Sequence, residues 1–287
     1  MAAEATIGII GGSGLYDMAE VTGREERTIA TPFGEPSGPY TVGTLGGARV
    51  AFLARHGIGH TLLPTEINFR ANIYGFKVLG VERLLSASAV GSLKEQYRPL
   101  DIVVPDQFFD RTRARISTFF GGGLVAHVGF AHPVCGELAR VAADAAAEVG
   151  ARVHRGGTYV NMEGPHFSTL AESRLYRTWG MDVIGMTNLQ EAKLAREAEL
   201  CLATLALATD YDCWNTAHAD VQSDDVLRVL HANVDLARRT VTRLAAALPA
   251  RSGCPCPTAL EHAIITDRAA IPEAARRELA LIAGRYL

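Results

Sequence analysis

The sequence lacks several features that would assign it to a special class of protein. No apolar run reaches the roughly 18 residues that a membrane-spanning helix requires. Lysine and arginine number 28 against 31 acidic residues, a formal net charge of −3, so no basic excess attracts nucleic acid or an anionic membrane. The opening segment MAAEATIGIIGG carries an acidic residue and turns directly into a strand pattern, unlike a secretory signal peptide. We therefore expect a cytoplasmic protein with neither nucleic-acid nor membrane partners.

Cysteine is also scarce, and its spacing excludes the disulfide framework of small secreted proteins. The five cysteines are Cys135, Cys201, Cys213, Cys254 and Cys256. Cys254-Pro255-Cys256 places two thiols one residue apart, which is too tight for a standard CxxC zinc knuckle, so we expect no metal site among the cysteines. A redox-active or stabilising disulfide is compatible with the sequence, and which cysteines pair is left open.

The chain of 287 residues, 48% of them hydrophobic, is long enough for one large α/β domain or two small ones. Strand-like runs alternate with helical segments, which is typical of the α/β class. We expect strands at 6–10, 40–45, 49–54, 84–89, 102–105, 152–162, 183–185 and 202–208. We expect helices at 68–79, 137–149, 169–179, 189–200 and 224–248, and two short helical pieces within 258–287. The segment 106–131 has no periodicity and is expected to be a functional or interface loop.

The stretch CLATLALATDYDCW, residues 201–214, brings two carboxyl groups out of an apolar interior. Its apolar run is typical of a strand buried on both faces, and Asp210 and Asp212 follow it. Because side chains two apart on an extended chain point the same way, we expect the two carboxyl groups to lie side by side. Two close carboxylates beside a dry core cannot both ionise cheaply, so one should have a raised pKa and act as a general acid. The alternative is an ordinary loop in which each Asp accepts from a neighbouring amide.

Groups suited to an anion follow several other strands. Gly11-Gly12-Ser13-Gly14 follows the first strand, but lacks the third glycine of a dinucleotide fingerprint, so it favours a small anion over NAD. Arg55-His56 ends another strand, and Ser88 and Thr187 end two more. In an open α/β sheet, ligands bind beyond the carboxyl ends of the strands. This convergence favours an enzyme over a purely structural protein.

Five long blocks resemble the 5′-methylthioadenosine phosphorylases, which belong to the trimeric branch of the purine nucleoside phosphorylase family. They are IGIIGGSGLYD, TPFGEPS, FLARHGIGHTLLPTEINFRANI, NMEGPHFSTLAESRLYRTWGMDVIGMT and ATDYDCW. The resemblance implies one α/β domain over 1–287, with a central mixed, distorted β-barrel sheet flanked by helices and a C-terminal helical extension over 249–287. It also implies a homo-oligomer, a trimer or a dimer of trimers, whose active sites lie at subunit interfaces. No metal or organic cofactor is implied.

The resemblance also implies roles for individual residues. It assigns phosphate binding to Ser13, Arg55, His56, Ser88, Ala89 and Thr187. It assigns the nucleoside to Met186, Phe167, Asp210 and Asp212, the specificity pocket to Ser168, and closure of the 5′ pocket from a neighbouring subunit to His127. Ser223 stands where relatives often carry an apolar residue near Leu227, so a more polar pocket that admits adenosine is left open.

The implied reaction is phosphorolysis of 5′-methylthioadenosine to adenine and 5-methylthioribose 1-phosphate. In it, a protonated Asp210 would neutralise the purine at N7, and Asp212 would accept from the 6-amino group. A 6-oxo purine presents only an acceptor there, so the Asp pair should favour adenine. The alternatives are a purine nucleoside phosphorylase acting on adenosine, inosine, guanosine or methylthioinosine, and a nucleoside-binding protein without activity.

Overall fold

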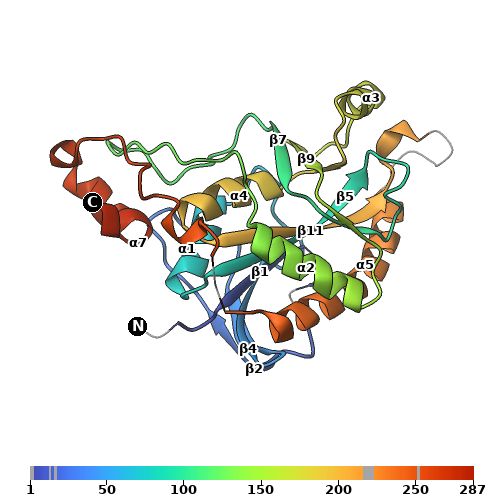
Figure 1. Ribbon diagram of the computed structural model, residues 1–287, viewed down its shortest axis with the longest axis horizontal. Coiled ribbons are helices and arrows are strands. Elements are labelled where there is room, and N and C mark those ends of the chain that lie inside the picture. The colour runs from blue at the N-terminus through green and yellow to red at the C-terminus, as the bar shows by residue number, and fades with distance from the viewer. Residues whose placement is uncertain (1–2, 13, 16–17, 216–222, 251–252) are drawn as a thin grey trace.

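The structure is built on one mixed β-sheet with helices on both faces (Figure 1). The computed structural model describes residues 3–12, 14–15, 18–215, 223–250 and 253–287. Within these residues the sheet has 11 strands. They are β1 (Ile7–Gly11), β2 (Thr22–Arg27), β3 (Tyr40–Leu45), β4 (Ala48–Ala54), β5 (Arg83–Ser92), β6 (Ile102–Val104), β7 (Gln107–Arg111), β8 (Val153–Arg155), β9 (Thr158–Met162), β10 (Val183–Gly185) and β11 (Cys201–Asp210).

Strand β5 is the branch point of this sheet. Along one edge it pairs first with β1, in parallel, and then with β10, antiparallel. Along its other edge it pairs in parallel with β11 from Cys201 to Asp210, and β6 and β8 follow beyond β11. The sheet therefore divides into two arms and does not close into a complete barrel. The predicted α/β class, with a mixed and distorted sheet flanked by helices, is confirmed.

Two groups of helices cover the two faces of the sheet. The helices are α1 (Phe69–Val78), α2 (Gly136–Glu148), α3 (Leu170–Thr178), α4 (Asn188–Glu197), α5 (Ser223–Ala247), α6 (Glu273–Glu278) and α7 (Ala280–Ala283), with short 3-10 turns at η1 (Asp212–Trp214), η2 (Cys256–Thr258), η3 (Arg268–Ala270) and η4 (Gly284–Tyr286). The helices α1, α4 and α7 share one hydrophobic core, and α2 and α5 share the other. No helix in the described ranges is both long and apolar enough to cross a bilayer.

The two cores arise from the alternation of side chains along the strands. Ile10 and Leu84 pack in the core beneath α1 and α4, whereas Ile9 and Leu85 pack beneath α2 and α5. Successive residues of a strand point to opposite faces. A strand covered by helices on both faces therefore reads as a continuous apolar run, and this pattern predicted β1, β5 and β11.

The structure corrects two expectations about the middle of the chain. The segment 106–131 is not structureless, because it begins with β7, which pairs with β9 at the end of one arm of the sheet. The strand expected over residues 152–162 was to be interrupted at Gly156-Gly157; the interruption is there, but it separates two strands, because β8 pairs with β6 and β9 pairs with β7 and β10. Gly156 and Gly157 lie between them with φ of 80° and 110°. These left-handed conformations turn the chain from one arm of the sheet to the other.

Candidate active site

One cavity of about 510 Å³ lies where β5, β10 and β11 end and where the chain leaves β4. Most of the predicted site residues line it, namely Arg55, His56, Ser88, Ala89, Phe167, Met186, Thr187, Asp210 and Asp212. Ser168 is half-buried close to the cavity, and its hydroxyl lies near enough to Asp212 to lower the pKa of that carboxyl group. Ser13 lies outside the described residues, and the side chain of Ser223, the first residue of α5, is not described either. The structure thus brings the predicted purine residues, and those predicted phosphate residues that it describes, to one cavity.

Asp210 and Asp212 meet in this cavity, although by a different route from the one expected. The strand ends at Asp210, where the pairing with β5 shifts register opposite Gly91, and such a bulge redirects the side chain. Asp212 has a φ of 50° and opens the turn η1. The expectation that both carboxyl groups project from one extended chain is therefore wrong. The backbone N–H of Asp212 instead donates to Oδ1 of Asp210 over 2.7 Å, which holds the two residues together.

Burial raises the pKa of both carboxyl groups. For Asp210 burial is the main cause, and the charge of Asp212 adds to it, while the hydroxyl of Thr209 partly offsets both. Burial likewise raises the pKa of Asp212, and the nearby hydroxyls of Ser173 and Ser168 lower it by less. The sequence predicted one raised pKa from mutual repulsion. The structure shows that both are raised, and that desolvation outweighs repulsion.

The raised pKa of Asp210 predicts a pH-dependent contribution to stability. Because the folded chain holds this proton more tightly than the unfolded chain does, the contribution is complete below the unfolded pKa and is lost as pH rises through the folded pKa. We therefore expect the unfolding free energy of wild type, relative to Asp210→Asn, to decline across that interval. Urea unfolding of both proteins at a series of pH values measures this difference. A difference that rises with pH would contradict the raised pKa.

Thr209 can leave the acidic proton of Asp210 free for a ligand. Its hydroxyl donates to Oδ2 of Asp210 over 2.6 Å and also lies 3.2 Å from the backbone carbonyl of Val90. When Oδ2 carries a proton, the Thr209 hydroxyl can donate to Val90 alone. The protonated carboxyl group can then donate into the cavity.

Oδ2 of Asp212 is an unmatched acceptor in the cavity wall. It is buried, and although the hydroxyls of Ser173 and Ser168 lie near this carboxyl group, no residue that the structure describes donates to Oδ2 with good geometry. A buried acceptor without a partner is costly. The position therefore suits a ligand that brings its own N–H donor.

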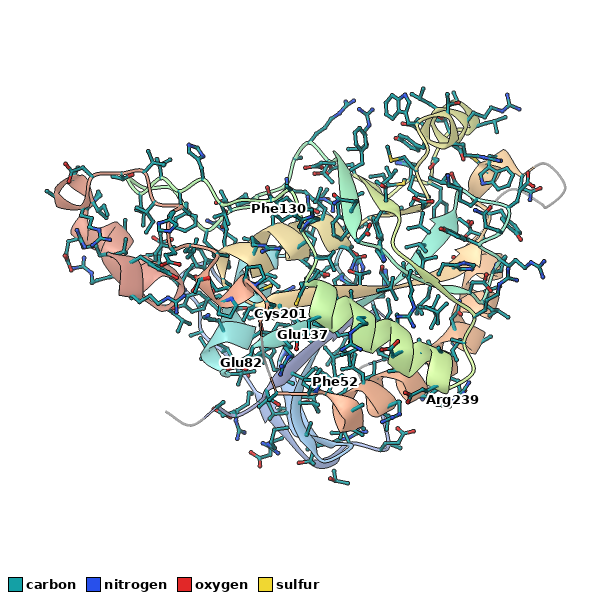
Figure 2. All side chains as sticks on the ribbon, viewed as in Figure 1. Phe52, Glu82, Phe130, Glu137, Cys201 and Arg239 are labelled. Carbon is teal, nitrogen blue, oxygen red and sulfur yellow. The ribbon has the colours of Figure 1, made fainter. Side chains whose placement is uncertain are left out.

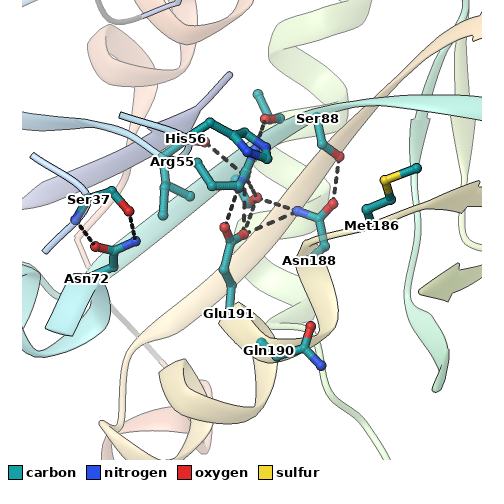
Figure 3. Close-up of polar contacts among 12 residues, drawn as sticks. Ser37, Arg55, His56, Asn72, Ser88, Met186, Asn188, Gln190 and Glu191 are labelled. Atoms are coloured by element: carbon teal, nitrogen blue, oxygen red, sulfur yellow. Dashed lines mark hydrogen bonds and ion pairs between the residues drawn. The ribbon is translucent and has the colours of Figure 1, made fainter. Parts of the chain in front are cut away.

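Arg55 is held by a buried polar network that the sequence did not reveal (Figure 3). Its side chain is 1% exposed, and its Nε lies 2.5 Å from Oε1 of Glu191, which is fully buried on α4. Its two terminal nitrogens donate to the carbonyl of Ala87 over 3.0 Å and to the hydroxyl of Ser86 over 2.7 Å. Asn188 donates to Ser86 and accepts from Ser88 over 2.5 Å. Arg55 is thus neither a surface arginine nor an uncompensated charge.

The pairing of Arg55 with Glu191 changes what can attract an anion. A carboxylate in contact with the guanidinium cancels most of its long-range field, so Arg55 alone does not make the cavity strongly positive. Thr187 is the N-cap of α4 and its own side chain makes no capping bond, while Oδ1 of Asn161 accepts from the N–H of Leu189 in the first turn over 3.2 Å. The dipole of α4 still favours an anion at this N-terminus, beside Ser88 and Arg55.

His56 enters this site as a neutral imidazole. Burial, and to a smaller extent the charge of Arg55, lower its pKa to about 4. Its Nδ1 lies 2.9 Å from the carbonyl of Leu62, which only accepts, so Nδ1 carries the hydrogen. Nε2 is then an acceptor, and it can take a hydrogen bond from a protonated phosphate oxygen or a sugar hydroxyl. The ring of His60 stacks on His56 with centroids 4.2 Å apart.

Arg115 positions the side of the cavity that carries Met186, a role that the sequence did not predict. Its guanidinium donates to the backbone carbonyls of Met186 and Glu163 and, over 3.1 Å, to Oε1 of Gln190. It comes from the segment after β7 and is almost fully buried. Arg115 thereby ties that segment to the turn between β10 and α4. No sequence spacing marks this arginine among the others of its segment.

His127 does not line the cavity of its own chain. Its side chain is exposed, and its backbone N–H donates to the carbonyl of Ala263 over 2.8 Å. The segment around it lies beside the C-terminal extension (Figure 1), with a bridge between Ala126 and Ile264. The predicted role of His127 requires a second copy of the chain and stays a prediction.

Comparisons with known proteins agree with this geometry. The model of the phosphorylase superfamily matches residues 6–246. An S-methyl-5′-thioadenosine phosphorylase of Koribacter versatilis is 61% identical over 99% of this chain and 97% of that protein, and one of Gloeobacter violaceus is 60% identical over 99% and 96%. The crystal structure of a methylthioadenosine phosphorylase from an antarctic soil metagenomic library superposes with a TM-score of 0.93, at 46% identity over 98% of this chain and 99% of that one.

A further solved structure is a variant of the adenosine/methylthioadenosine phosphorylase of Schistosoma mansoni in complex with methylthioadenosine. It superposes with a TM-score of 0.79, at 35% identity over 86% of this chain and 93% of that one.

Proposed function

Because this chain belongs to the phosphorylase superfamily, we propose that it catalyses the phosphorolysis of 5′-methylthioadenosine. Phosphate attacks the sugar at C1′, and the products are adenine and 5-methylthioribose 1-phosphate. The observation that carries the proposal is the composition of one cavity. The cavity is lined by a carboxyl group with a raised pKa, by a carboxylate oxygen without a hydrogen-bond partner of good geometry, and by the hydroxyl-bearing residues Ser88 and Thr187 at the N-terminus of α4.

Asp210 acts as the general acid in this reaction. As the bond to the purine breaks, positive charge develops on the sugar and negative charge on the base. A protonated Asp210 donates to purine N7, so the base leaves without a net charge. Its buried position keeps the proton bound closer to neutral pH than on an ordinary Asp, and acid catalysis of this kind contributes about 10²–10⁴-fold.

Phosphate occupies the part of the cavity at the N-terminus of α4. The hydroxyls of Ser88 and Thr187, the N-terminus of α4 and one edge of Arg55 surround the anion. Neutral His56 accepts from a protonated phosphate oxygen. Because Arg55 is already paired with Glu191, the site holds phosphate through many short hydrogen bonds rather than through one excess charge. The anion is thereby placed next to the developing charge on the sugar.

An assay of adenine release with and without phosphate tests the proposed reaction. Methylthioadenosine and the purified chain should give adenine and a sugar phosphate only when phosphate is present. Equal release of adenine without phosphate would indicate a hydrolase, and purine binding without turnover would indicate a binding protein.

Asp212 selects the 6-amino purine. Its unmatched Oδ2 accepts from the amino group of adenine, whereas a 6-oxo purine presents another acceptor. Replacing Asp212 by Asn supplies a donor in place of the acceptor. We expect the ratio of kcat/KM for methylthioadenosine over methylthioinosine to fall by about ten- to a hundredfold, which is the range for one mismatched buried hydrogen bond.

The matched control for this change is Cys213→Ser, which alters the next residue without changing the acceptor. Its preference for the amino purine should stay within about threefold of wild type, because the substitution changes the free energy by less than the loss of one buried hydrogen bond would. An unchanged ratio in Asp212→Asn would remove Asp212 from base recognition.

Adenosine is a second candidate substrate. The Schistosoma mansoni relative carries adenosine as well as methylthioadenosine in its name, and Ser223 places a hydroxyl-bearing residue at the start of α5 in this chain. We propose that a 5′-hydroxyl is accepted with lower efficiency. Comparison of the two nucleosides at saturating phosphate, in wild type and in Ser223→Val, tests this.

The active unit in this proposal is a homo-oligomer, a trimer or a dimer of trimers. Leu63 and Phe167 line the cavity but are 45% and 46% exposed in the single chain, and Ile58, which precedes Leu63 in the same loop, is 63% exposed. Covering such apolar groups favours association. Light scattering should give a mass of about three or six times 30.7 kDa. The absence of a metal or organic cofactor from the reaction, and a cytoplasmic location, stay predictions from the sequence.

A further inference from the structure

Four of the five cysteines meet outside the cavity, although they come from three separate parts of the chain. Cys135 precedes α2, Cys201 opens β11, and Cys254 and Cys256 belong to the C-terminal extension. Their sulfur atoms all lie within 4.8 Å of one another. All five cysteines are free thiols in the structure. We call these four residues the cysteine cluster.

The geometry of the cysteine cluster fits a tetrahedral ion better than it fits disulfides. Four sulfurs at about 2.3 Å from a central Zn²⁺ are about 3.8 Å apart, and the Sγ atoms of Cys201 and Cys254 are 3.4 Å apart. A disulfide would bring two sulfurs to about 2.05 Å and would place no demand on the other two. Here every sulfur is close to the other three. A tetrahedral ion requires this arrangement, and two independent disulfides do not.

The surroundings of the cysteine cluster also suit a structural metal site. Cys135, Cys201 and Cys256 are at most 3% exposed, and the cluster belongs to the core beneath α2 and α5. Cys135 is the N-cap of α2, a helix of 13 residues, and a helix N-terminus stabilises a thiolate. Water is therefore largely excluded. Four cysteine ligands would also leave no coordination position for water or a substrate, as in structural zinc sites.

Hydrogen bonds of the main chain hold two of the four cysteines in place. The backbone N–H of Cys135 donates to the carbonyl of Leu202 over 2.8 Å, and that of Cys201 donates to the carbonyl of Glu82 over 3.0 Å. In Figure 2, Cys201 marks the start of β11 and Glu137 the first turn of α2, the two elements that the bond from Cys135 to Leu202 joins. Cys254 and Cys256 then complete the set from the extension. This anchoring fixes part of the site before a metal binds.

We propose that the cysteine cluster binds one Zn²⁺ as four thiolates. Soft thiolate ligands in a tetrahedral arrangement select zinc over the harder divalent ions. On binding, the four thiols release their protons to the solvent and the ion is held by four Zn–S bonds. The proposal replaces the expectation from spacing that the cysteines bind no metal. That expectation considered only Cys254-Pro255-Cys256, whereas two ligands come from elsewhere in the fold.

The zinc ion would fasten the C-terminal extension to the sheet. The extension is otherwise attached by contacts such as those of Leu260 and Tyr286 with the carboxylate of Glu199. Within the extension, the carbonyl of Ala263 accepts a hydrogen bond from the N–H of His127. Holding the extension in place therefore also restrains the segment that contains His127. Cys201 and Asp210 lie at opposite ends of β11, about 30 Å apart along a strand of this length. The metal is therefore structural and does not take part in the chemistry.

Metal analysis of the full chain, purified under reducing conditions, tests the proposal. We expect about one zinc per chain in wild type, retained after dialysis against a weak chelator, as for structural zinc sites. Cys254→Ser and Cys256→Ser should each lower the zinc content at least tenfold. Cys213→Ser, the cysteine outside the cluster, should retain it. Replacement of zinc by Co²⁺ should give the visible absorption of a tetrahedral cobalt thiolate in wild type and Cys213→Ser only.

Thiol counting keeps the proposal testable even when the serine variants do not fold. In the native wild type, four thiols should resist a thiol reagent until a strong chelator or denaturant is added, and five should react afterwards. A metal-free chain lighter by two hydrogen atoms per bond would show disulfides instead and overturn the proposal. So would a metal-free chain with five free thiols, or zinc retained in both Cys254→Ser and Cys256→Ser.

Discussion

Replacing Asp210 by Asn is expected to lower kcat for adenine release by about 10²–10⁴-fold, which is the usual contribution of a general acid. The amide keeps the shape of the side chain and can still donate a hydrogen bond to purine N7, but it cannot transfer a proton. KM should therefore change little. Initial rates of phosphorolysis at saturating phosphate measure both constants.

The pH dependence of the same variant separates loss of the acid from loss of structure. In wild type, kcat/KM should fall as pH rises through the raised pKa of Asp210, because the acid is lost on that side. The residual rate of Asp210→Asn should lack this fall, and dividing the two profiles cancels the ionisation of phosphate. Asp106→Asn, an exposed residue that accepts from the N–H of Gly157, should keep the wild-type profile. A loss of less than about threefold in kcat would exclude Asp210 as the acid.

Replacing Glu191 by Gln is expected to destabilise the chain by about 3–5 kcal/mol, because it leaves the buried guanidinium of Arg55 without its counter-charge. The midpoint of thermal unfolding should fall by roughly 10 °C. Phosphate should then stabilise the variant by more than it stabilises wild type, since the anion takes over the role of the missing carboxylate. A ligand at a hundred times its Kd adds about 2.7 kcal/mol. Thermal unfolding with increasing phosphate measures this difference.

Glu197 supplies the control on the same helix. Its carboxyl group accepts from the Thr118 hydroxyl and the Phe119 N–H, both over 2.7 Å, and burial raises its pKa to about 7. Glu197→Gln resembles the protonated form that is already populated near neutral pH, so it should cost about 1 kcal/mol or less. Its response to phosphate should equal that of wild type. A similarly small loss in Glu191→Gln, with no added response to phosphate, would show that the ion pair does not control the anion site.

Local patterns in the sequence predicted the parts of the fold that depend on local physics. The apolar run 202–208 gave a strand because a segment buried on both faces needs no polar side chains, and β11 covers it. Asn68 was expected at the start of a helix, and its side chain caps α1 by accepting from the N–H of Ala71 over 3.1 Å. Strand β2, with the polar sequence TGREER, is exposed, so no burial pattern marked it.

Contacts between distant segments explain what the sequence did not predict. Glu191 lies in a helix with many charged residues, and nothing local separates it from glutamates that face solvent. It is buried because Arg55, 136 positions away, is delivered to it by β4. Arg115 and the cysteine cluster likewise acquire their surroundings only when separate segments pack together. The side-by-side placement of Asp210 and Asp212 was predicted, but from an extended chain that the structure replaces with a turn.

The left-handed backbone at Asp212 (φ of 50°) limits which substitutions at this position could change purine specificity during evolution. Most side chains lose about 1–2 kcal/mol in that conformation, whereas Gly, Asn and Asp tolerate it. Replacing Asp212 by Asn therefore adds no backbone strain to the loop, so this single substitution can alter purine specificity without destabilising the fold. Replacement by Glu or Ala would strain the loop, so few evolutionary routes lead away from this position.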